Sequence, residues 1–490
     1  MFLENKKLLV MVGLFGWAVM AFFTFFNILK FSPSSCYFLS YWPFCGSVGF
    51  RLEILKLAIL TFIFVSISLL GYFSFKNLIE DQSRLVWVVV PLILALVFFV
   101  LPFASNDLQF YFSLGKAVDG GINPYVEPWV VENNFFYPKS NSFIEGVMYG
   151  PLSIDFFLIF YKLSGGSLVS FILLWKLLML AILAVCGFLI MKICNFSLDN
   201  KKTFYLFWFT QPLLLFEWVG NGHFDGIWLL FILLSFIFAR SNLWGLVVIS
   251  LVIGTWIKFI PVLFSPWFLL WWWQEVDRIN WLKRLSSVSA GVLVSAVITV
   301  VGWWPYWQGF SVFKPIILQS KWAVHSLFAT FYYSLEPVSV GLFDNRSHWF
   351  LTRFLHLVLF FVAIYFLWPL VKGVINVFLR KSKWDFKEFS IAIFLSLFTY
   401  LFVWQKSFWP WYSIWVVVIG IIPYLLTKNI YLGKILLWLS SVSLFFYVPW
   451  MMFGGNAGGV MFNWFGVLIF SVYPLLQLFL WRSKKYSLIW

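Results

Sequence analysis

The sequence predicts an all-α, polytopic membrane protein with about 13–15 transmembrane helices. Hydrophobic residues make up 62% of the 490-residue chain, and charged residues make up only 11% of it. The mean hydropathy is +0.91, and no water-soluble protein of this size needs so much apolar surface, because its outside would have to face water. The 31 Trp and 20 Tyr suit the aromatic belts that lie at the two interfaces of a membrane.

Each expected helix corresponds to an apolar stretch that is long enough, or nearly long enough, to cross a bilayer. The stretches lie at 8–29, 52–73, 85–104, 149–163, 167–191, 203–219, 224–239, 243–260, 261–273, 286–306, 347–371, 389–404, 411–427, 431–452 and 460–481. No repeat and no soluble domain interrupts them, so we treat 1–490 as a single integral membrane domain. Within it we expect an N-terminal helix pair (1–84), a central region (85–306) and C-terminal helices (307–490).

The net charge of +15 comes from Lys and Arg side chains that gather in short loops between the apolar stretches. This pattern indicates cytoplasmic loops beside anionic lipid, and no basic domain is present that would bind a nucleic acid. The inside segments are marked by Lys6 and Lys7, by Lys192, Lys201 and Lys202, by Arg278, Lys283 and Arg284, by Arg380, Lys381, Lys383 and Lys387, and by Arg482, Lys484 and Lys485. Both ends of the chain are therefore expected inside.

These assignments agree only if one stretch before residue 192 does not cross the bilayer. The best candidate is 149–163, which is about fifteen residues long and starts with Tyr149-Gly150-Pro151. A re-entrant or interfacial segment there leaves about fourteen crossings. Three segments then lie outside: an acidic loop at 105–148 with interfacial helices, the "GNGHFDG" turn, and residues 307–346.

The four cysteines lack metal-ligand spacing. Cys186 and Cys194 lie in or beside an expected helix, where a thiol packs as a small apolar group. Cys36 and Cys45 share one expected external loop, where they either form a disulfide or stay free thiols.

A polar segment, "SNDLQFYFSLGKAVDGGINPYVEPW", directly follows an apolar stretch and places the carboxylate of Asp107 at the membrane surface. Tyr111 comes one helical turn later and on the same face. "GGINPY" then reads as a turn that ends the helix, because Gly and Pro both interrupt helices. Two interpretations stay open: Asp107 is a functional acid, or it only caps the interfacial helix.

A second polar segment, "GNGHFDGIW" at residues 220–228, interrupts an almost purely apolar region. His223 and Asp225 are expected where a helix re-enters the lipid, and a charge there is costly unless it is paired or faces water. The alternative is a helix start, with Asn221 as the cap and Asp225 in the first turn.

Several cations are expected on the same external side. Lys258 in "GTWIKFIP" ends an apolar stretch, where a lysine either extends to the interface or meets an anionic phosphate. Lys406 in "WQKSFWPWYSIW" lies among aromatic residues, which indicates cation–π packing or phosphate binding. Lys321, His325, Arg346 and His348 occupy the segment before it.

The motifs of several enzyme classes are absent. No P-loop, G-x-G-x-x-G, H-E-x-x-H or G-x-S-x-G occurs in the sequence. Nucleotide-driven transport, Rossmann chemistry, zincin proteolysis and serine hydrolysis therefore have no support.

Short motifs nevertheless follow one another in a specific order. They are "ND…Y…GGINPY", "YGPL", "NGHFDG", "IKFIP", "HSL" and "FWPWYSIW". In this order, over roughly residues 85–427, the chain resembles the GT-C superfamily of membrane glycosyltransferases. It is most similar to the bacterial polyprenol-phosphate-mannose-dependent mannosyltransferases.

The resemblance implies an inverting hexosyltransferase of the plasma membrane that works at the external face on a cell-envelope glycan. The expected sugar is mannose, the donor a polyprenyl phosphate sugar, and the acceptor a lipid-linked sugar, glycan or glycolipid. Asp107 matches the general base that takes the proton of the acceptor hydroxyl. Cations must stabilise the leaving phosphate, and the candidates are Lys258, His325, Arg346 and Lys406.

The resemblance also assigns substrate-binding positions. These are Tyr111, Asn123, Tyr125, Tyr149, His223, Asp225, Lys258, His325, Arg346, Lys406, Trp411 and Tyr412. No cofactor is required, and a divalent metal is compatible but not needed.

Two departures from the superfamily pattern stand out. Two helices precede the loop of Asp107 where one is usual, and "YGPL" stands where a doubled proline is common. A flippase or permease for a lipid-linked sugar is the alternative function, but it would not need its acids gathered on one face, and no paired halves are seen. A structural subunit with a degenerate site is the third interpretation.

Overall fold

The computed structural model describes most of the chain. The described residues are 6–25, 47–80, 86–100, 102, 105–131, 142–195, 198–275, 281–319, 323–343, 347–448 and 460–483. Arg346, Cys36 and Cys45 lie outside them, and so do Lys321 and the middle of the 105–148 loop.

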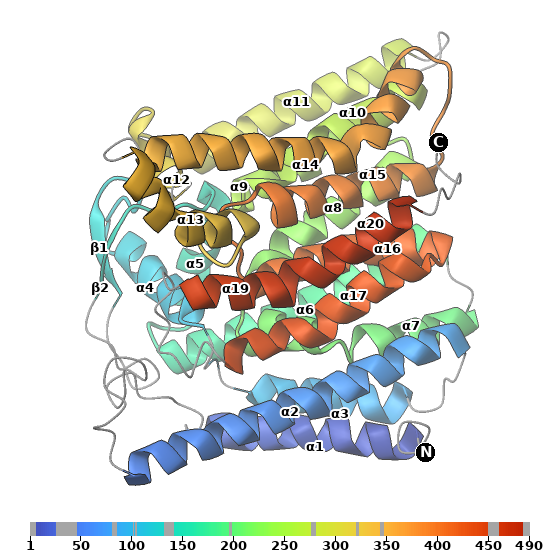
Figure 1. Cartoon of the computed structure of the whole chain (residues 1–490). Coiled ribbons are helices and arrows are strands. Elements are labelled where there is room, and N and C mark those ends of the chain that lie inside the picture. Colours follow the sequence, from blue (N-terminus) through green and yellow to red (C-terminus); the bar gives the residue numbers. More distant parts are fainter. Residues whose placement is uncertain are drawn as a thin grey trace.

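Helices make up nearly all of the described structure (Figure 1). They are α1 (Lys6–Phe25), α2 (Ser47–Glu80), α3 (Val86–Phe99), α4 (Asp107–Asp119), α5 (Pro151–Leu163), α6 (Leu168–Cys194), α7 (Leu198–Trp208), α8 (Asp225–Arg240), α9 (Trp244–Ile257), α10 (Ser265–Glu275), α11 (Trp281–Trp303), α12 (Lys314–Gln319), α13 (Leu327–Phe343), α14 (Ser347–Phe378), α15 (Phe386–Thr399), α16 (Ser413–Thr427), α17 (Ile430–Val442), α19 (Val460–Val467) and α20 (Tyr473–Ser483). Tighter or wider helical turns are η3 (Leu214–Gly220), η4 (Ile260–Phe264), η5 (Ser311–Phe313), η7 (Tyr400–Trp404), η8 (Pro410–Tyr412), η9 (Ser443–Phe446) and η10 (Leu468–Val472).

Among the described residues, seven helices are long and apolar enough to cross a membrane, or eight if the bent pair η3 and α8 forms one span. Shorter apolar helices of 10–17 residues accompany them. The prediction of an all-α polytopic membrane protein is thereby confirmed. The stretch expected at 203–219 is not one span, because α7 ends at Trp208 and Pro212 separates it from η3.

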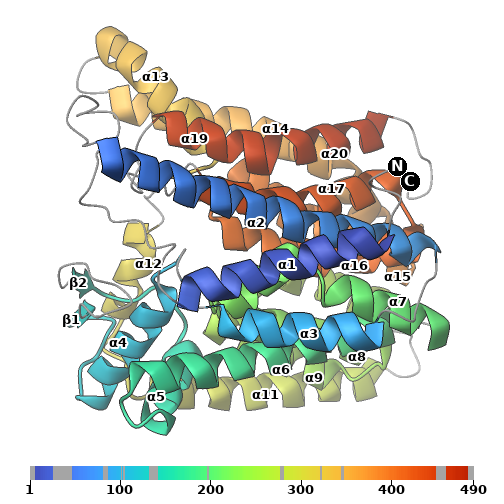
Figure 2. The same cartoon turned by 90° about the horizontal axis from the view of Figure 1, so that it is seen from below.

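The helices lie side by side, with their ends at two opposite faces of the molecule (Figures 1 and 2). One face carries α4, α12 and a small hairpin, and we call it the hairpin end. The other carries the start of α1 and the end of α20, and we call it the termini end. Basic loops meet at the termini end, where Lys383 pairs with Glu275 at 2.8 Å and Arg284 donates to the Glu275 carbonyl.

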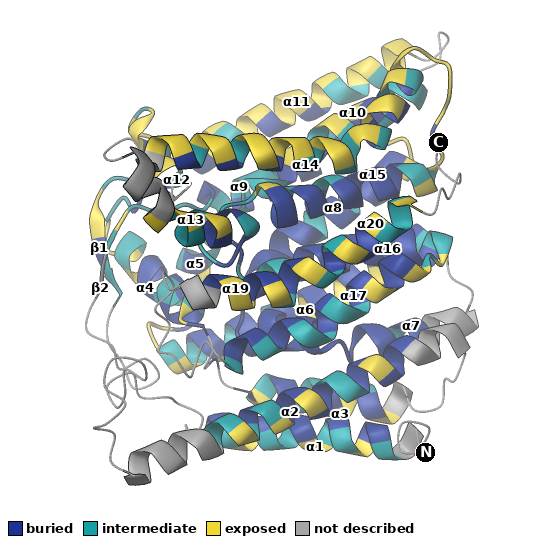
Figure 3. Ribbon diagram, in the orientation of Figure 1, coloured by how far each residue is buried: buried dark blue, intermediate teal, exposed yellow. Residues whose placement is uncertain are grey.

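Burial separates the inner helices from the outer ones (Figure 3). In the span Pro410–Thr427, which contains α16, 78% of the residues are buried, whereas only 17% are buried in the apolar helix α11 and 22% in the span of α14. Large apolar side chains cover the outer helices, and such a surface is stable against lipid rather than water. The inner helices α8 and α16 therefore form the buried interior of the protein, and the hairpin end lies at one end of it.

A two-stranded hairpin is the element that the all-α prediction did not include. Strand β1 (Pro128–Val131) pairs antiparallel with β2 (Ser142–Glu145), and Trp129 lies opposite Ile144. Each strand has only four residues, so the alternation of apolar and polar residues is too short to predict a strand from sequence. The expected interfacial helix of the same loop is present as α4.

The short stretch at 149–163 forms α5, a helix of 13 residues that begins at Pro151. Its start is pressed against the end of α9: the Gly150 N–H donates to the Ile257 carbonyl at 3.2 Å, and a side chain on Gly150 would collide with the Trp256 backbone. Glycine is needed for this close approach. The contact brings the C-terminal end of α9 to the hairpin end.

The turn between η3 and α8 bends the chain by 116°. Gly222 at its centre has φ +74°, and a side chain there would strike Leu108 on α4. Trp175 of α6 donates from its indole nitrogen to the Gly222 carbonyl at 2.8 Å. The sequence "GNGH" therefore folds as a tight turn held between α4 and α6.

One charged residue lies inside the helical interior. Lys176 of α6 is completely buried, and its ammonium donates to the carbonyls of Val97, at 3.2 Å, and Val100. Helix α3 ends at Phe99, so the two carbonyls lie in its last turn and just beyond it, and the Val97 carbonyl also accepts from the Val100 N–H at 3.1 Å. The ammonium thus caps α3 from a neighbouring helix and fixes the chain that leads to α4.

Candidate active site

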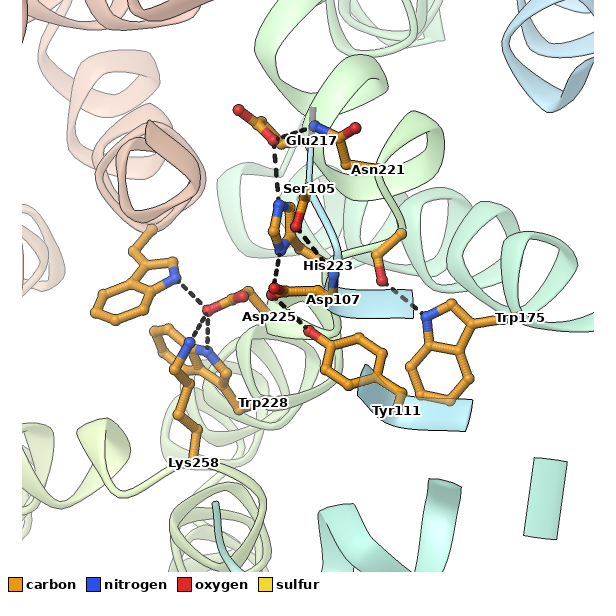
Figure 4. Close-up of polar contacts among 12 residues, drawn as sticks. Ser105, Asp107, Tyr111, Trp175, Glu217, Asn221, His223, Asp225, Trp228 and Lys258 are labelled. Carbon is orange, nitrogen blue, oxygen red and sulfur yellow. Dashed lines mark hydrogen bonds and ion pairs between the residues drawn. The ribbon is translucent and has the colours of Figure 1, made fainter. Parts of the chain in front are cut away.

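Acidic and basic side chains meet where α4, the 221–224 turn and the ends of α8 and α9 converge (Figure 4). They form two linked groups, one around His223 and one around Asp225. We call the set the acid cluster, and its members are Asp107, Glu217, His223, Asp225 and Lys258.

Asp107 is the first residue of α4, after Asn106, whose side chain makes no capping bond. Its Oδ2 accepts a hydrogen bond from the Tyr111 hydroxyl at 3.1 Å and contacts His223 Nδ1 at 3.0 Å. The one-turn spacing of Asp107 and Tyr111 thus gives the contact that the sequence predicted. Both of these bonds fall on Oδ2.

His223 lies between two carboxylates. Its Nδ1 contacts Asp107, and its Nε2 lies 3.3 Å from Oε2 of Glu217. Glu217 is completely buried in η3, and it accepts a hydrogen bond of 2.8 Å from Asn221. The imidazole also stacks on Trp411, with ring centres 4.2 Å apart. These contacts fix the orientation of the imidazole ring. Asn221 donates a hydrogen bond to Glu217 and does not cap α8.

The electrostatics of the pair favour its charged forms. Burial alone would raise the pKa of Asp107, but the His223 charge and the hydrogen bonds from His223, Tyr111 and Ser105 bring it below its ordinary value. Burial also lowers the pKa of His223, which lies in the turn between two helices. Asp107 and Glu217 outweigh that effect and raise it to about 9. Near neutral pH the cluster therefore holds an imidazolium against an ionised Asp107.

Asp225 is the first residue of α8 and is only 1% exposed. Its Oδ1 accepts from the Lys258 ammonium at 2.6 Å, from the Trp415 indole at 2.6 Å and from the Trp228 indole at 3.4 Å. Lys258 follows the last residue of α9 in extended conformation. This buried carboxylate oxygen thus accepts from one cation and two indole donors, which offset the cost of burying the charge.

Aromatic rings surround the Lys258 ammonium. It lies 4.7 Å from the Trp415 ring centre and 5.2 Å from the centres of Tyr412 and Phe224. Tyr149 packs edge-on against Phe224, with ring centres 4.7 Å apart. Tyr149 and Tyr412 thus both lie near Asp107 and Asp225. The Lys258 ammonium has three N–H groups, so it keeps donors for an anion besides the one that Asp225 accepts.

Asn123 and Tyr125, also expected at the substrate, hold the loop in place. The Asn123 amide donates to the Tyr306 carbonyl at 2.9 Å, and its oxygen accepts from the Tyr125 N–H at 3.2 Å. The Tyr125 hydroxyl donates to the Tyr149 carbonyl at 2.8 Å. Asn123 and Tyr125 of "GGINPY" therefore tie the end of α4 to the residues after α11 and before α5.

Two expected phosphate cations lie apart from the acid cluster. His325 is completely buried against Trp409 and Phe446, and burial lowers its pKa to about 4 despite an opposing backbone hydrogen bond. It is uncharged near neutral pH, so this setting gives no support to a role in charge stabilisation. Lys406 points its ammonium at Phe328, 5.2 Å from the ring centre. The third candidate, Arg346, is outside the described residues.

Sequence reasoning missed Glu217, Trp228 and Trp415. Glu217 had a usable signal, because a carboxylate inside the apolar stretch 203–219 is costly without a partner. Trp228 and Trp415 had no such signal in the sequence, because Trp is abundant throughout the chain. Among the described residues, no group of three or more His, Cys, Asp and Glu side chains could hold a metal ion.

The acid cluster has the parts for a reaction that removes a proton and releases an anion. Of its three carboxylates, Asp225 and Glu217 are buried, whereas the Asp107 side chain is 26% exposed. Only Asp107 among them can therefore meet a substrate hydroxyl. The Lys258 cation lies beside it at the hairpin end, where a departing anion would be stabilised.

A comparison with protein families gives one match. A family model described as "Alpha-(1->6)-mannopyranosyltransferase, N-terminal domain" matches residues 10–275. No curated protein matches the chain. The matched residues include every member of the acid cluster, whereas Trp411, Tyr412 and Trp415 come from the remainder of the chain.

Proposed function

The chain belongs to the family of alpha-(1->6)-mannopyranosyltransferases, and from that premise we propose that it transfers mannose from a polyprenyl phosphate donor to a hydroxyl of a glycan or glycolipid acceptor. The observation that carries the proposal is the partly exposed Asp107 in the same cluster as the buried Asp225–Lys258 pair. One acid is placed to accept a proton and one cation to meet a phosphate. No observation favours the alternative of a flippase or permease.

In the proposed reaction the acceptor hydroxyl gives its proton to the carboxylate of Asp107 while its oxygen attacks the anomeric carbon. The bond from that carbon to the phosphate oxygen breaks, and the electron pair leaves with the lipid phosphate. His223 and Tyr111 fix Oδ2 of Asp107, and Lys258 stabilises the negative charge of the leaving group. Attack from the side opposite the phosphate inverts the anomeric configuration.

Inversion has a consequence for the donor. If the product linkage is alpha, as in the family description, the sugar must be beta-linked to the donor phosphate. The purified protein should transfer mannose from a beta-mannosyl polyprenyl phosphate to a mannoside with a free 6-hydroxyl, and the 6-deoxy mannoside should be inert. NMR of the product gives its anomeric configuration. Equal use of an alpha-linked donor or of a nucleotide sugar would overturn the proposal.

The proposal places the hairpin end outside the plasma membrane and the basic termini end inside, since Lys and Arg favour the cytoplasmic side. Ser311 at the hairpin end and Ser382 at the termini end are both exposed, and they form a matched pair for labelling. In a cysteine-free background, a membrane-impermeant maleimide added to intact cells should label Ser311→Cys and not Ser382→Cys. Labelling of Ser382→Cys in intact cells would reverse the assignment of faces.

A further inference from the structure

A basic cluster lies apart from the acid cluster, beside α13 and α14. It consists of Arg353 and His356 on α14 and of Lys406 in the segment between η7 and η8. The His356 ring lies 4.9 Å from the Phe328 ring, and the Lys406 ammonium lies 5.2 Å from the same ring. Two separate parts of the chain thus bring their basic groups to one aromatic side chain.

The two cations of the cluster, Arg353 and Lys406, both lie near His356. Arg353 and His356 are three positions apart on α14 and so lie on the same helix face, and the charges of Arg353 and Lys406 both act on His356. No carboxylate pairs with any of them within the part of the chain that the structure describes. Like charges held together without an acid create a site for an anion.

The surroundings indicate what kind of anion would bind. Phe354 and Leu357 beside these residues are 47% and 55% exposed, and Trp404 is 42% exposed. Trp349 is 65% exposed, and the Arg353 guanidinium lies 5.7 Å from its ring centre. The basic groups therefore sit beside apolar surface that is open to lipid, within the first turns of α14 at the hairpin end (Figure 1). A headgroup phosphate with acyl chains attached would contact both kinds of surface.

The two cations of the cluster, and not His356, would bind the anion. His356 Nδ1 lies 2.6 Å from the Thr352 carbonyl oxygen and must donate there, because a carbonyl can only accept. In the neutral ring Nε2 then has only a lone pair, so it gives no hydrogen bond to a phosphate oxygen. The guanidinium of Arg353 and the ammonium of Lys406 can each donate to phosphate oxygens.

We propose that Arg353 and Lys406 bind the phosphate of an anionic phospholipid in the leaflet at the hairpin end. The site is distinct from the acid cluster, because the Lys406 ammonium lies over Phe328 and the Lys406 carbonyl accepts from the Val324 N–H and the Ser326 hydroxyl, none of which belongs to that cluster. It does not depend on the proposed sugar transfer. A lipid bound there would hold α14 close to the segment that leads into η8. The turn η8 carries Trp411 and Tyr412, which lie at the active site.

The experiment compares lipid binding by the full-length protein in nanodiscs. Phosphatidylglycerol should raise the melting temperature of the unaltered protein above its value in phosphatidylcholine alone. The double change Arg353→Gln with Lys406→Gln should weaken the apparent affinity for phosphatidylglycerol by about tenfold, since each cation near the surface contributes. Native mass spectrometry of the released protein counts the bound lipid.

Two control proteins keep the test specific. Lys372→Gln with Lys381→Gln removes the same charge from exposed positions at the other end of α14 and should leave binding unchanged. Arg353→Lys with Lys406→Arg keeps the charge and should restore it. Equal weakening by the Lys372 and Lys381 changes would overturn the site. Displacement of phosphatidylglycerol by equimolar polyprenyl phosphate would overturn the phospholipid as its occupant.

Discussion

Replacing Asp107 with Asn should lower mannosyl transfer by about two to four orders of magnitude. The amide keeps the shape of the side chain and can still accept a hydrogen bond from Tyr111, but it cannot take the proton of the acceptor hydroxyl. Its loss also leaves the His223 imidazolium with Glu217 as its only acidic partner in the cluster. The measurement is turnover of the purified variant at saturating donor, together with donor binding, which should change little.

The matched control for this change lies at the other end of the same helix. Asp119 is the last residue of α4 and pairs with Lys162 at 3.2 Å, where both side chains are exposed. An exposed pair of this kind contributes little to stability, so Asp119→Asn should keep normal turnover. Near-normal turnover by the Asp107→Asn protein would remove Asp107 as the general base of the mechanism.

Replacing Lys258 with Met should destabilise the protein by about 3–5 kcal/mol, the usual cost of removing one partner from a buried ion pair. Asp225 is 1% exposed, and without the ammonium it would keep only its two indole donors. The double change Lys258→Met with Asp225→Asn removes both charges and should recover most of the stability. It should not recover transfer, because no cation then meets the leaving phosphate.

Thermal unfolding in detergent measures how much Lys258 stabilises the protein, and a donor-binding assay measures its contact with the donor phosphate. Lys383→Met is the control, because Lys383 pairs with Glu275 at 2.8 Å but is 61% exposed. That change should alter stability by less than about 1 kcal/mol and leave donor binding intact. If the double variant transfers mannose normally, Lys258 only neutralises Asp225 and has no part in the reaction.

Local spacing allowed part of the site to be predicted from the sequence. Asp107 and Tyr111 are one turn apart, so a helix starting near Asp107 brings them together whatever the rest of the fold does. The "GNGHFDG" turn is likewise readable, because its glycines and polar residues interrupt an apolar region. Both predictions depended only on neighbours in the chain.

Contacts between distant segments could not be predicted in the same way. The pairing of Asp107 with His223 joins residues 116 positions apart, and the bond from Trp415 to Asp225 joins residues 190 positions apart. Composition and periodicity say which helices exist, but not which of their ends meet. The same limit explains why His325 was expected among the phosphate cations, since only its packing against Trp409 and Phe446 reveals an uncharged ring.

The buried Lys176 has a consequence for the synthesis of the protein. A lysine near the middle of an inserting helix costs about 2.5–3.5 kcal/mol, and in the folded state the carbonyls of Val97 and Val100 offset that cost. Helix α3 precedes α6 in the chain, so these carbonyls leave the ribosome before the lysine does. We therefore expect α6 to enter the bilayer as a partner of α3 and not as an independent segment. Assembly of this helix pair during synthesis would fix the position of the segment between α3 and Asp107 before the C-terminal half of the protein has been made.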